Sequence, residues 1–262
     1  MRHLANLLAA LYAGLVYLFI FLPVAMLVLF SFQDGGLPVP PLNGLTLRWY
    51  EAILADRKLM AALSNSLLVA VLSSAVACLL GFLAAYALAR YRLPASALLR
   101  GLIVAPMTVS TLIIGLGLLS VLNVAGLRLS LLTIGIGHVV INLPLCFAVI
   151  YASMGAHQVN IERAARDLGA NDWQVMALVT APMLMPSILA AFFLSVTFSW
   201  DEFIVAFLLS RFDVTLPIEI WNLLRSGLDP KTNAIGSIVF LISVACLVVL
   251  ELTVLRRTGK SP

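Results

Sequence analysis

Long apolar runs alternate with shorter polar stretches along the chain. A helix that crosses a bilayer needs about 20 mostly apolar residues. Six runs meet this requirement, at Leu11–Phe32, Leu63–Ala89, Leu98–Leu122, Leu132–Met154, Met183–Ser210 and Ala234–Leu255. The first run is too long for a signal-peptide core, and no cleavage site of small residues follows it, so we expect it to be retained. The pattern therefore predicts six membrane-spanning helices.

Composition agrees with this prediction. The chain is 62% hydrophobic and 11% charged, with a mean hydropathy of +1.08, whereas a soluble domain carries about 25% charged residues. We expect an all-α integral membrane protein. The net charge of +4 does not argue for nucleic acid. Each of the three cysteines lies in an apolar run without metal-like spacing, which favours packing roles for Cys78, Cys146 and Cys246.

The basic residues predict the orientation of the spans. An even number of spans places both termini on one side of the membrane. Arg90, Arg92 and Arg100 cluster between the second and third spans, and Arg256 and Arg257 follow the last. Because cytoplasmic loops carry an excess of Lys and Arg, we predict that both termini are cytoplasmic.

The spans and their connections divide the chain into three parts. Residues 1–62 contain the first span and an extracytoplasmic segment, with a surface helix predicted around Leu47–Glu51. Residues 63–255 form the transmembrane domain, and residues 256–262 form a cytoplasmic tail.

Small and helix-breaking residues mark two of the spans. In the second span, small residues recur every four positions, at Ala77, Gly81, Ala85 and Ala89. Such a stripe lets another helix approach closely, and we favour packing within the chain over a contact between subunits. Asn142 and Pro144 are expected to interrupt the fourth span.

A polar segment at about residues 155–182 separates the fourth and fifth spans and is cytoplasmic in the predicted orientation. Asn160 is a good helix N-cap, and Glu162 then lies in the first turn, where the helix dipole favours an anion. Gly169 stands where a helix end takes a left-handed residue. The first helix of the segment keeps a narrow smooth face made of Ala164, Ala165 and Leu168.

A second short helix follows the glycine. Asn171 and Gln174 have the spacing of a capping box, and Pro182 ends the helix before the fifth span. One interpretation is an amphipathic hairpin on the membrane surface, which usually has a wider apolar face and more basic residues opposite it. The alanine-rich face suits insertion into a groove of a soluble protein instead.

The segment resembles the cytoplasmic loop of permease subunits of ABC importers. That loop contains Glu-Ala-Ala, three residues, Gly, nine residues, Ile, one residue and Leu-Pro. Here Arg163-Ala164-Ala165, Gly169, Val179 and Ala181-Pro182 occur at matching spacing. Arg163 stands where the family has Glu, with Glu162 beside it, and Ala181 replaces Leu. The resemblance implies that the ATPase-coupling residues are Glu162, Ala164, Ala165, Asp167, Leu168, Gly169 and Pro182.

Further segments resemble the spermidine/putrescine branch of these permeases: Leu47–Tyr50, Asn65–Leu67, Ser199–Phe203 and Leu216–Trp221. The resemblance implies the type I importer architecture, with coupling helices, in the bacterial inner membrane. It also implies a second related permease subunit, two ATPase subunits and a periplasmic binding protein. ATP and Mg would be held by the ATPases, because this chain has no phosphate-binding loop. We expect no cofactor, no metal and no enzymatic activity of its own.

The fifth span contains the candidate residues of a translocation path. Asp201 and Glu202 lie well inside it, and a carboxylate in a membrane is costly unless it faces a bundle interior or a watery cavity. We predict that Asp201 helps to pass a cationic substrate, with Trp200 offering a cation–π surface. A structural bond to a partner helix is an equally weighted alternative. Asn142 is a further candidate, although we favour helix packing for it.

The sequence thus predicts the permease subunit of an ATP-driven importer, with polyamines as the substrate. Movement of the ATPases would shift the helices around Gly169 and tilt the spans joined through Pro182. An ABC permease for iron, phosphonate or another small solute is the main alternative. A secondary transporter would show inverted repeats. An intramembrane serine protease would need a Ser–His pair, and His138, the single histidine in a span, is more easily explained as a hydrogen-bonded packing residue.

Overall fold

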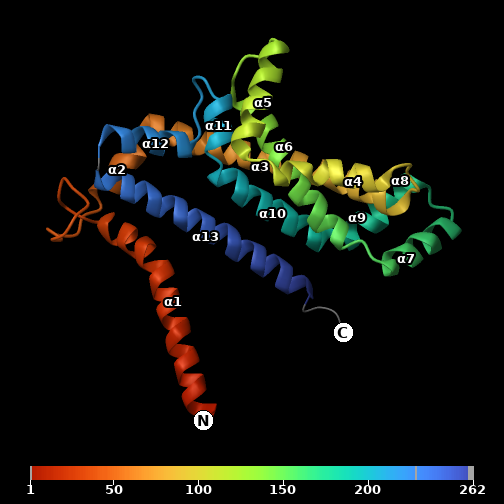
Figure 1. Ribbon diagram of the computed structural model, residues 1–262, viewed down its shortest axis with the longest axis horizontal. Coiled ribbons are helices and arrows are strands. Elements are labelled where there is room, and N and C mark those ends of the chain that lie inside the picture. Colours follow the sequence, from red (N-terminus) through yellow and green to blue (C-terminus); the bar gives the residue numbers. More distant parts are fainter. Residues whose placement is uncertain (1, 228, 259–262) are drawn as a thin grey trace. The chain divides into compact units, whose positions relative to one another are not determined.

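The computed structural model describes residues 2–227 and 229–258, and helices account for all regular elements of this part (Figure 1). One isolated antiparallel bridge pairs Gln33 with Leu45. The helices in chain order are α1 (Arg2–Phe30), α2 (Arg48–Ala55), α3 (Arg57–Arg90), α4 (Ser96–Val104), η1 (Ala105–Thr108), α5 (Thr111–Val124), α6 (Leu131–Ala152), α7 (Ala156–Asp167), α8 (Asp172–Gln174), η2 (Val175–Thr180), α9 (Ala181–Met183), α10 (Met185–Asp201), α11 (Ile204–Leu209), α12 (Leu216–Ser226) and α13 (Pro230–Thr258). Of the predicted tail, residues 259–262 lie outside the described residues.

The described residues contain four helices long and apolar enough to cross a membrane, or up to six spans if each of two bent helix pairs counts as one. The single spans are Asn6–Phe30, Arg57–Arg90, Leu131–Ala152 and Pro230–Val249. This confirms the prediction of an all-α membrane protein, and the predicted number of six spans is reached when each bent pair counts as one span. Pro144 lies inside α6 without ending it, so the expected interruption of the fourth span is wrong.

Two predicted spans are not single straight helices. The third is bent by 107° between Thr108 and Thr111, where η1 carries Pro106 near its start and Val109 is extended. The predicted helix Met183–Ser210 is also wrong in detail. It ends at Asp201, because Glu202 has an extended backbone with φ −74° and ψ 111°, and α11 begins at Ile204. Asp201 therefore stands at a helix end.

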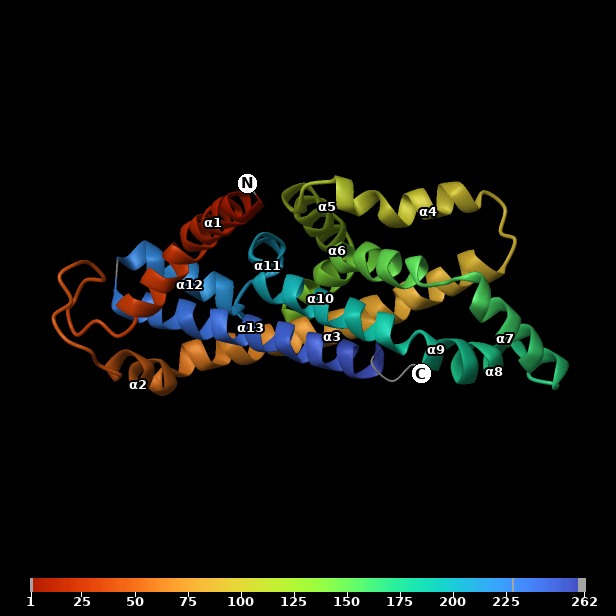
Figure 2. The same cartoon turned by 90° about the horizontal axis from the view of Figure 1, so that it is seen from below.

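The chain forms two compact units, Met1–Met60 with Glu219–Ser243 and Ala61–Ile218 with Val244–Pro262. In the second unit, α3, α6 and α10 pack around a core that includes Phe82, Phe147 and Ala191 (Figure 2). A Cβ on Gly81 would come within 2.8 Å of the backbone nitrogen of Phe147. The small-residue stripe of α3 thus packs within the chain, as favoured above.

The cysteine prediction is confirmed for two of the three residues. The sulfur atoms of Cys78 and Cys146 are 3.3 Å apart, and both residues are buried free cysteines in the core of the second unit. A second cluster, which includes Leu122, Ile134 and Val205, joins α11 to α5 and α6. After the break that follows Asp201, the chain therefore remains packed against other spans.

The first unit holds α1, α2 and a polar network at the start of α3. The predicted surface helix is confirmed as α2, and the indole nitrogen of its Trp49 donates to the carbonyl oxygen of Gln33 at 2.7 Å. Only 6% of the apolar window of α1 is buried within the chain. Within the first unit, most of the apolar surface of α1 is therefore uncovered.

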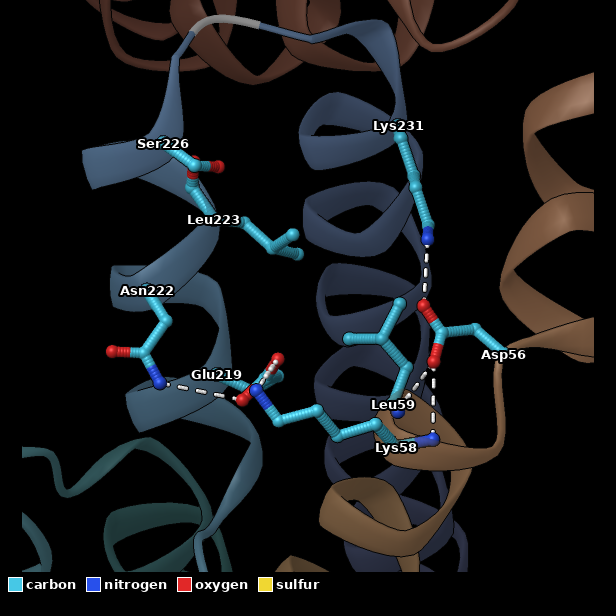
Figure 3. A network of polar contacts seen from close by, with 8 residues as sticks. All are labelled: Asp56, Lys58, Leu59, Glu219, Asn222, Leu223, Ser226 and Lys231. Atoms are coloured by element: carbon cyan, nitrogen blue, oxygen red, sulfur yellow. Dashed lines mark hydrogen bonds and ion pairs between the residues drawn. The ribbon is translucent and has the colours of Figure 1, made fainter.

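Figure 3 shows how the polar network joins the start of α3 to α12 and α13. Asp56 accepts the backbone N–H groups of Lys58 and Leu59, at 3.0 and 3.3 Å, and so caps α3. Its other carboxylate oxygen lies 2.7 Å from the ammonium group of Lys231. That hydrogen bond is the main reason why the pKa of Asp56 is below its usual value. Lys58 lies 2.9 Å from the buried carboxylate of Glu219, which completes the link to α12.

Candidate functional site

The polar segment after α6 folds into two helices joined by a glycine turn. Gly169 has a φ of +92°, in the left-handed region. Its N–H donates to the carbonyl oxygen of Arg166 at 2.9 Å, and the N–H of Ala170 donates to that of Ala165 at 3.1 Å. These two bonds form a Schellman motif, which satisfies carbonyl groups at the end of α7. The predicted role of Gly169 as a helix terminator is confirmed.

The start of the first helix differs from the prediction. Helix α7 begins at Ala156, so Asn160 and Glu162 both lie inside the helix, and the predicted N-cap at Asn160 and the first-turn position of Glu162 are wrong. Gly155 occupies the cap position, and its N–H donates to the side-chain oxygen of Gln158 at 2.9 Å. The spacing of Gly155 and Gln158 was the signal that could have identified this start.

The second helix begins as predicted. The N–H of Gln174 donates to the side-chain oxygen of Asn171, and the N–H of Asn171 donates to that of Gln174, both at 2.9 Å. Helix α8 then continues without a break through the π-helical η2 and through α9. A bend of 72° separates this continuous rod, which consists of α8, η2 and α9, from α10. Pro182 lies within α9, next to the bend.

An ion pair closes the turn between the two helices. The guanidinium nitrogen Nε of Arg166 lies 3.0 Å from a carboxylate oxygen of Asp172. This hydrogen bond is the main reason why the pKa of Arg166 is raised above its ordinary value. The pair is partly exposed, so it contributes at most about 1 kcal/mol.

Most of the predicted coupling residues lie on the surface of this segment. Ala164, Asp167, Gly169 and Pro182 are exposed, Ala165 is half-buried, and Leu168 has 90% of its surface exposed. Sequence reasoning missed two large exposed side chains on the second helix, Trp173 and Leu178. They differ from Val175 of the same helical segment, which is buried. The loop therefore presents apolar side chains on both sides of the glycine turn.

Glu162 differs from the other coupling residues because it is fully buried. Its Oε2 lies 2.6 Å from Nε of Arg90, at the end of α3. Its Oε1 accepts a hydrogen bond of 2.8 Å from the hydroxyl of Thr180, the last residue of η2. Sequence reasoning missed both partners and used Arg90 only as an orientation signal.

The four candidate residues of the translocation path have different environments. Asp201 is exposed at the end of α10, and Trp200 and Asn142 are buried. Glu202 is half-buried, and its carboxylate accepts the N–H of Val205 at 3.0 Å, which caps α11. Within the described chain, no hydrogen bond joins any two of these four residues.

A chain of hydrogen bonds holds α10 just before its end. Nδ1 of His138 lies 2.6 Å from the hydroxyl oxygen of Ser199, which lies 3.2 Å from that of Ser73. All three residues are buried, and they come from α6, α10 and α3. The interpretation of His138 as a hydrogen-bonded packing residue is confirmed. This series of hydrogen bonds fixes the part of α10 that leads directly to Asp201.

The structure offers little support for metal or hydrolytic chemistry. No group of three or more His, Cys, Asp or Glu residues that could hold a metal occurs in the part of the chain that the structure describes. His138 and Ser199 do form the kind of pair that a serine protease needs. However, both are more than 95% buried, and Ser199 also bonds to Ser73.

The chain has several apolar helices of spanning length, and a polar loop with a helix–glycine–helix structure lies between α6 and α10. This combination is typical of a multi-pass membrane permease subunit. Residues 77–257 match the family described as the inner membrane component of binding-protein-dependent transport systems, and the chain belongs to this family. It is an ABC importer permease of the inner membrane, a transport subunit rather than an enzyme. The secondary-transporter and protease alternatives are thereby set aside, and the resemblance drawn from the sequence is confirmed.

Individual relatives cover most of the chain. The spermidine/putrescine transport system permease protein PotC of Escherichia coli K12 is 26% identical over 244 residues, which are 93% of this chain and 92% of the relative. The putrescine transport system permease protein PotI of the same strain is 32% identical over 231 residues, which are 85% of this chain and 82% of the relative.

Solved structures share the fold. A chain of the bacterial alginate ABC transporter, in complex with an alginate pentasaccharide-bound periplasmic protein, has a TM-score of 0.71 and 17% identity, and the match covers 99% of this chain and 97% of that chain. A chain of an amino acid ABC transporter has a TM-score of 0.61 and 17% identity, with coverage of 81% and 100%. The fold is therefore that of the membrane chains of these ABC transporters.

Proposed function

We propose that this chain is the permease subunit of a bacterial importer for polyamines, such as spermidine and putrescine. The single observation that carries the substrate class is similarity to two polyamine permeases over 85% or more of the chain. Polyamines are cationic at neutral pH, and the exposed carboxylate of Asp201 at the end of α10 suits a cation.

The proposed assembly contains this chain, a second related permease, two ATPase subunits and a periplasmic binding protein. The ATPases hold ATP and Mg, and they dock on the cytoplasmic loop that contains Gly169. The exposed side chains of Leu168, Trp173 and Leu178 support docking, because apolar groups that project from a polar loop gain from burial in a protein groove. The Arg90, Arg92 and Arg100 cluster supports an orientation with both termini in the cytoplasm.

The proposed mechanism is alternating access driven from the loop. When the ATPases close, α7 and the rod formed by α8, η2 and α9 move, and the 72° bend before α10 passes this movement to the membrane helices. Asp201 meets the substrate on the path. Glu202, which caps α11, and the buried Trp200 and Asn142 act there only if the helices rearrange.

Uptake by the whole importer tests this function. We expect ATP-dependent accumulation of labelled spermidine or putrescine by proteoliposomes that contain the complete complex, and no accumulation without the binding protein. Accumulation of iron, a phosphonate or another solute in place of polyamines would refute the proposed substrate class.

Asp201→Asn tests the path residue in the same proteoliposomes. Loss of one charge-assisted contact of about 1.5–3 kcal/mol corresponds to roughly 10- to 150-fold slower uptake. Asp213→Asn, at an exposed carboxylate in the loop before α12, serves as the control and should transport normally. Unchanged uptake by Asp201→Asn at a normal subunit level would exclude the path role.

A further inference from the structure

The coupling loop contains one carboxylate that no docking partner can reach in this structure. Glu162 has no exposed surface, whereas Leu168, six residues later, is 90% exposed. Each oxygen of Glu162 has a partner from a different element: Arg90 from α3 at 2.6 Å, and Thr180 from η2 at 2.8 Å. Glu162 therefore lies at a junction of three helical elements.

The junction is held by a buried charge pair. The side chain of Arg90 is 9% exposed. A buried pair adds little net stability relative to a well-packed apolar contact, but removal of one partner leaves an uncompensated charge. The charge pair is therefore costly to break. When α7 moves, Arg90 must follow Glu162 or the pair must break, and the same holds for the hydrogen bond with Thr180.

The elements that meet at Glu162 lead to different spans. Arg90 is the last residue of α3, a helix of spanning length. Thr180 is the last residue of η2, which continues through α9 to the bend before α10. Short π-helical segments within α-helices often occur at functional sites. Movement of α7 can thus reach α3 and α10 through one side chain.

The junction also has unused hydrogen-bonding capacity. Nη2 of Arg90 is buried without a hydrogen-bond partner among the described residues, and so is the hydroxyl of Tyr86, one turn earlier on α3. Buried polar atoms of this kind need an explanation. These spare donors lie on α3 near the carboxylate, so they can hold the pair together when α7 and α3 move as one.

We propose that Glu162, Arg90 and Thr180 form a transmission joint that couples α7 to α3 and α10, and that Glu162 is a positioning residue rather than an ATPase contact. This proposal rests on the proposed function. It differs from a docking role in one measurable respect: loss of the joint leaves ATPase binding intact and lowers the amount of substrate moved per ATP hydrolysed.

The test uses the complete importer in proteoliposomes. Glu162→Gln keeps the size of the side chain and an acceptor for Thr180, but it removes the charge that faces Arg90. We expect ATPase subunits to co-purify at the wild-type level and uptake per ATP to fall by about tenfold, within the usual range of coupling free energies. Glu51→Gln, at an exposed glutamate of α2, makes the same chemical change elsewhere and should leave the ratio unchanged.

Two outcomes overturn the proposal. A wild-type ratio of uptake to hydrolysis in Glu162→Gln shows that the joint does not transmit movement, and loss of ATPase co-purification shows that Glu162 acts in docking. If Glu162→Gln does not reach the membrane, Thr180→Val decides instead, because it removes one hydroxyl and no charge. A lower ratio with normal ATPase binding supports the joint, and an unchanged ratio refutes it.

Failure of the proposed function has a different signature. It shows in the wild-type complex, which then does not accumulate polyamines. The ratio measured with whichever solute the wild-type complex does accumulate still tests the joint.

Discussion

Substitution of Gly169 separates two physical reasons why the turn of the coupling loop is sensitive to mutation. One reason is the backbone, because a φ of +92° is unfavourable for residues that carry a Cβ. The other is space, because the docked ATPase can lie close to the turn. Within the chain itself, a Cβ at Gly169 would meet nothing within 4 Å, so internal crowding does not contribute.

Asn and Val are similar in size but differ in how readily they adopt the left-handed backbone conformation. A left-handed conformation costs an ordinary residue about 1–2 kcal/mol, whereas Asn adopts it several-fold more readily. We therefore expect Gly169→Val to reduce the docking-competent population, and hence the apparent ATPase affinity, by about 5- to 30-fold. Gly169→Asn should lose only a small part of this affinity.

The assay is binding of the purified ATPase to the permease in nanodiscs, with uptake measured in parallel. Equal, severe loss of affinity in both variants would refute the backbone explanation and indicate a steric contact with the ATPase. Wild-type affinity in Gly169→Val would refute the requirement for the Schellman turn altogether.

Two further predictions concern stability. Gly81→Ala should lower the thermal unfolding temperature in detergent, because the new Cβ would lie 2.8 Å from the backbone nitrogen of Phe147. Overpacking of this kind costs about 1–3 kcal/mol. Gly135→Ala is the control: its Cβ would meet nothing within 4 Å, so this variant should not be destabilised. The pKa of Asp56 is lowered in the folded protein by its pair with Lys231. The pair therefore stabilises the fold fully at pH values above the unfolded-state pKa of about 3.9, and this stabilisation is lost as the pH falls through the folded-state pKa. Asp56→Asn should thus unfold at a lower temperature than the wild type at pH 7, and the difference should shrink below about pH 4; a difference that is constant with pH contradicts the role of the charge.

Features that depend on neighbouring residues could be predicted from the sequence. The length of apolar runs fixes which segments can cross a membrane, and the Asn171–Gln174 spacing defines a capping box whose two hydrogen bonds both form. Gly169 could be assigned because a left-handed helix end is a local requirement. The spacing of these residues also carried the family resemblance.

Helix direction could not be predicted in the same way. Hydropathy measures composition and is insensitive to a bend, so the 107° bend of the third span and the break after Asp201 remained hidden. Glu202 illustrates the reason. A glutamate inside an apolar run was interpreted as a path residue, whereas its carboxylate caps α11 through the N–H of Val205, three residues later.

The environment of Glu162 depends on partners far away in the sequence. Arg90 precedes it by 72 residues, and no local spacing relates the two. Acidic residues are almost never fully buried unless they are paired. The pair with Arg90 is what makes the burial possible.

The turn and the joint make separable contributions to coupling. Gly169 lies seven residues after Glu162, which is about 10 Å along a helix, and the hydrogen bonds of Gly169 and Ala170 go to Arg166 and Ala165 rather than to Arg90 or Thr180. Effects at such a separation, without shared partners, usually add. A variant with both Gly169→Val and Glu162→Gln should therefore show the affinity loss of the first and the reduced uptake per ATP of the second. If the Gly169 variant alone changes the ratio as much as the double variant, α7 does not move as a rigid body, and the turn itself is the transmitting element.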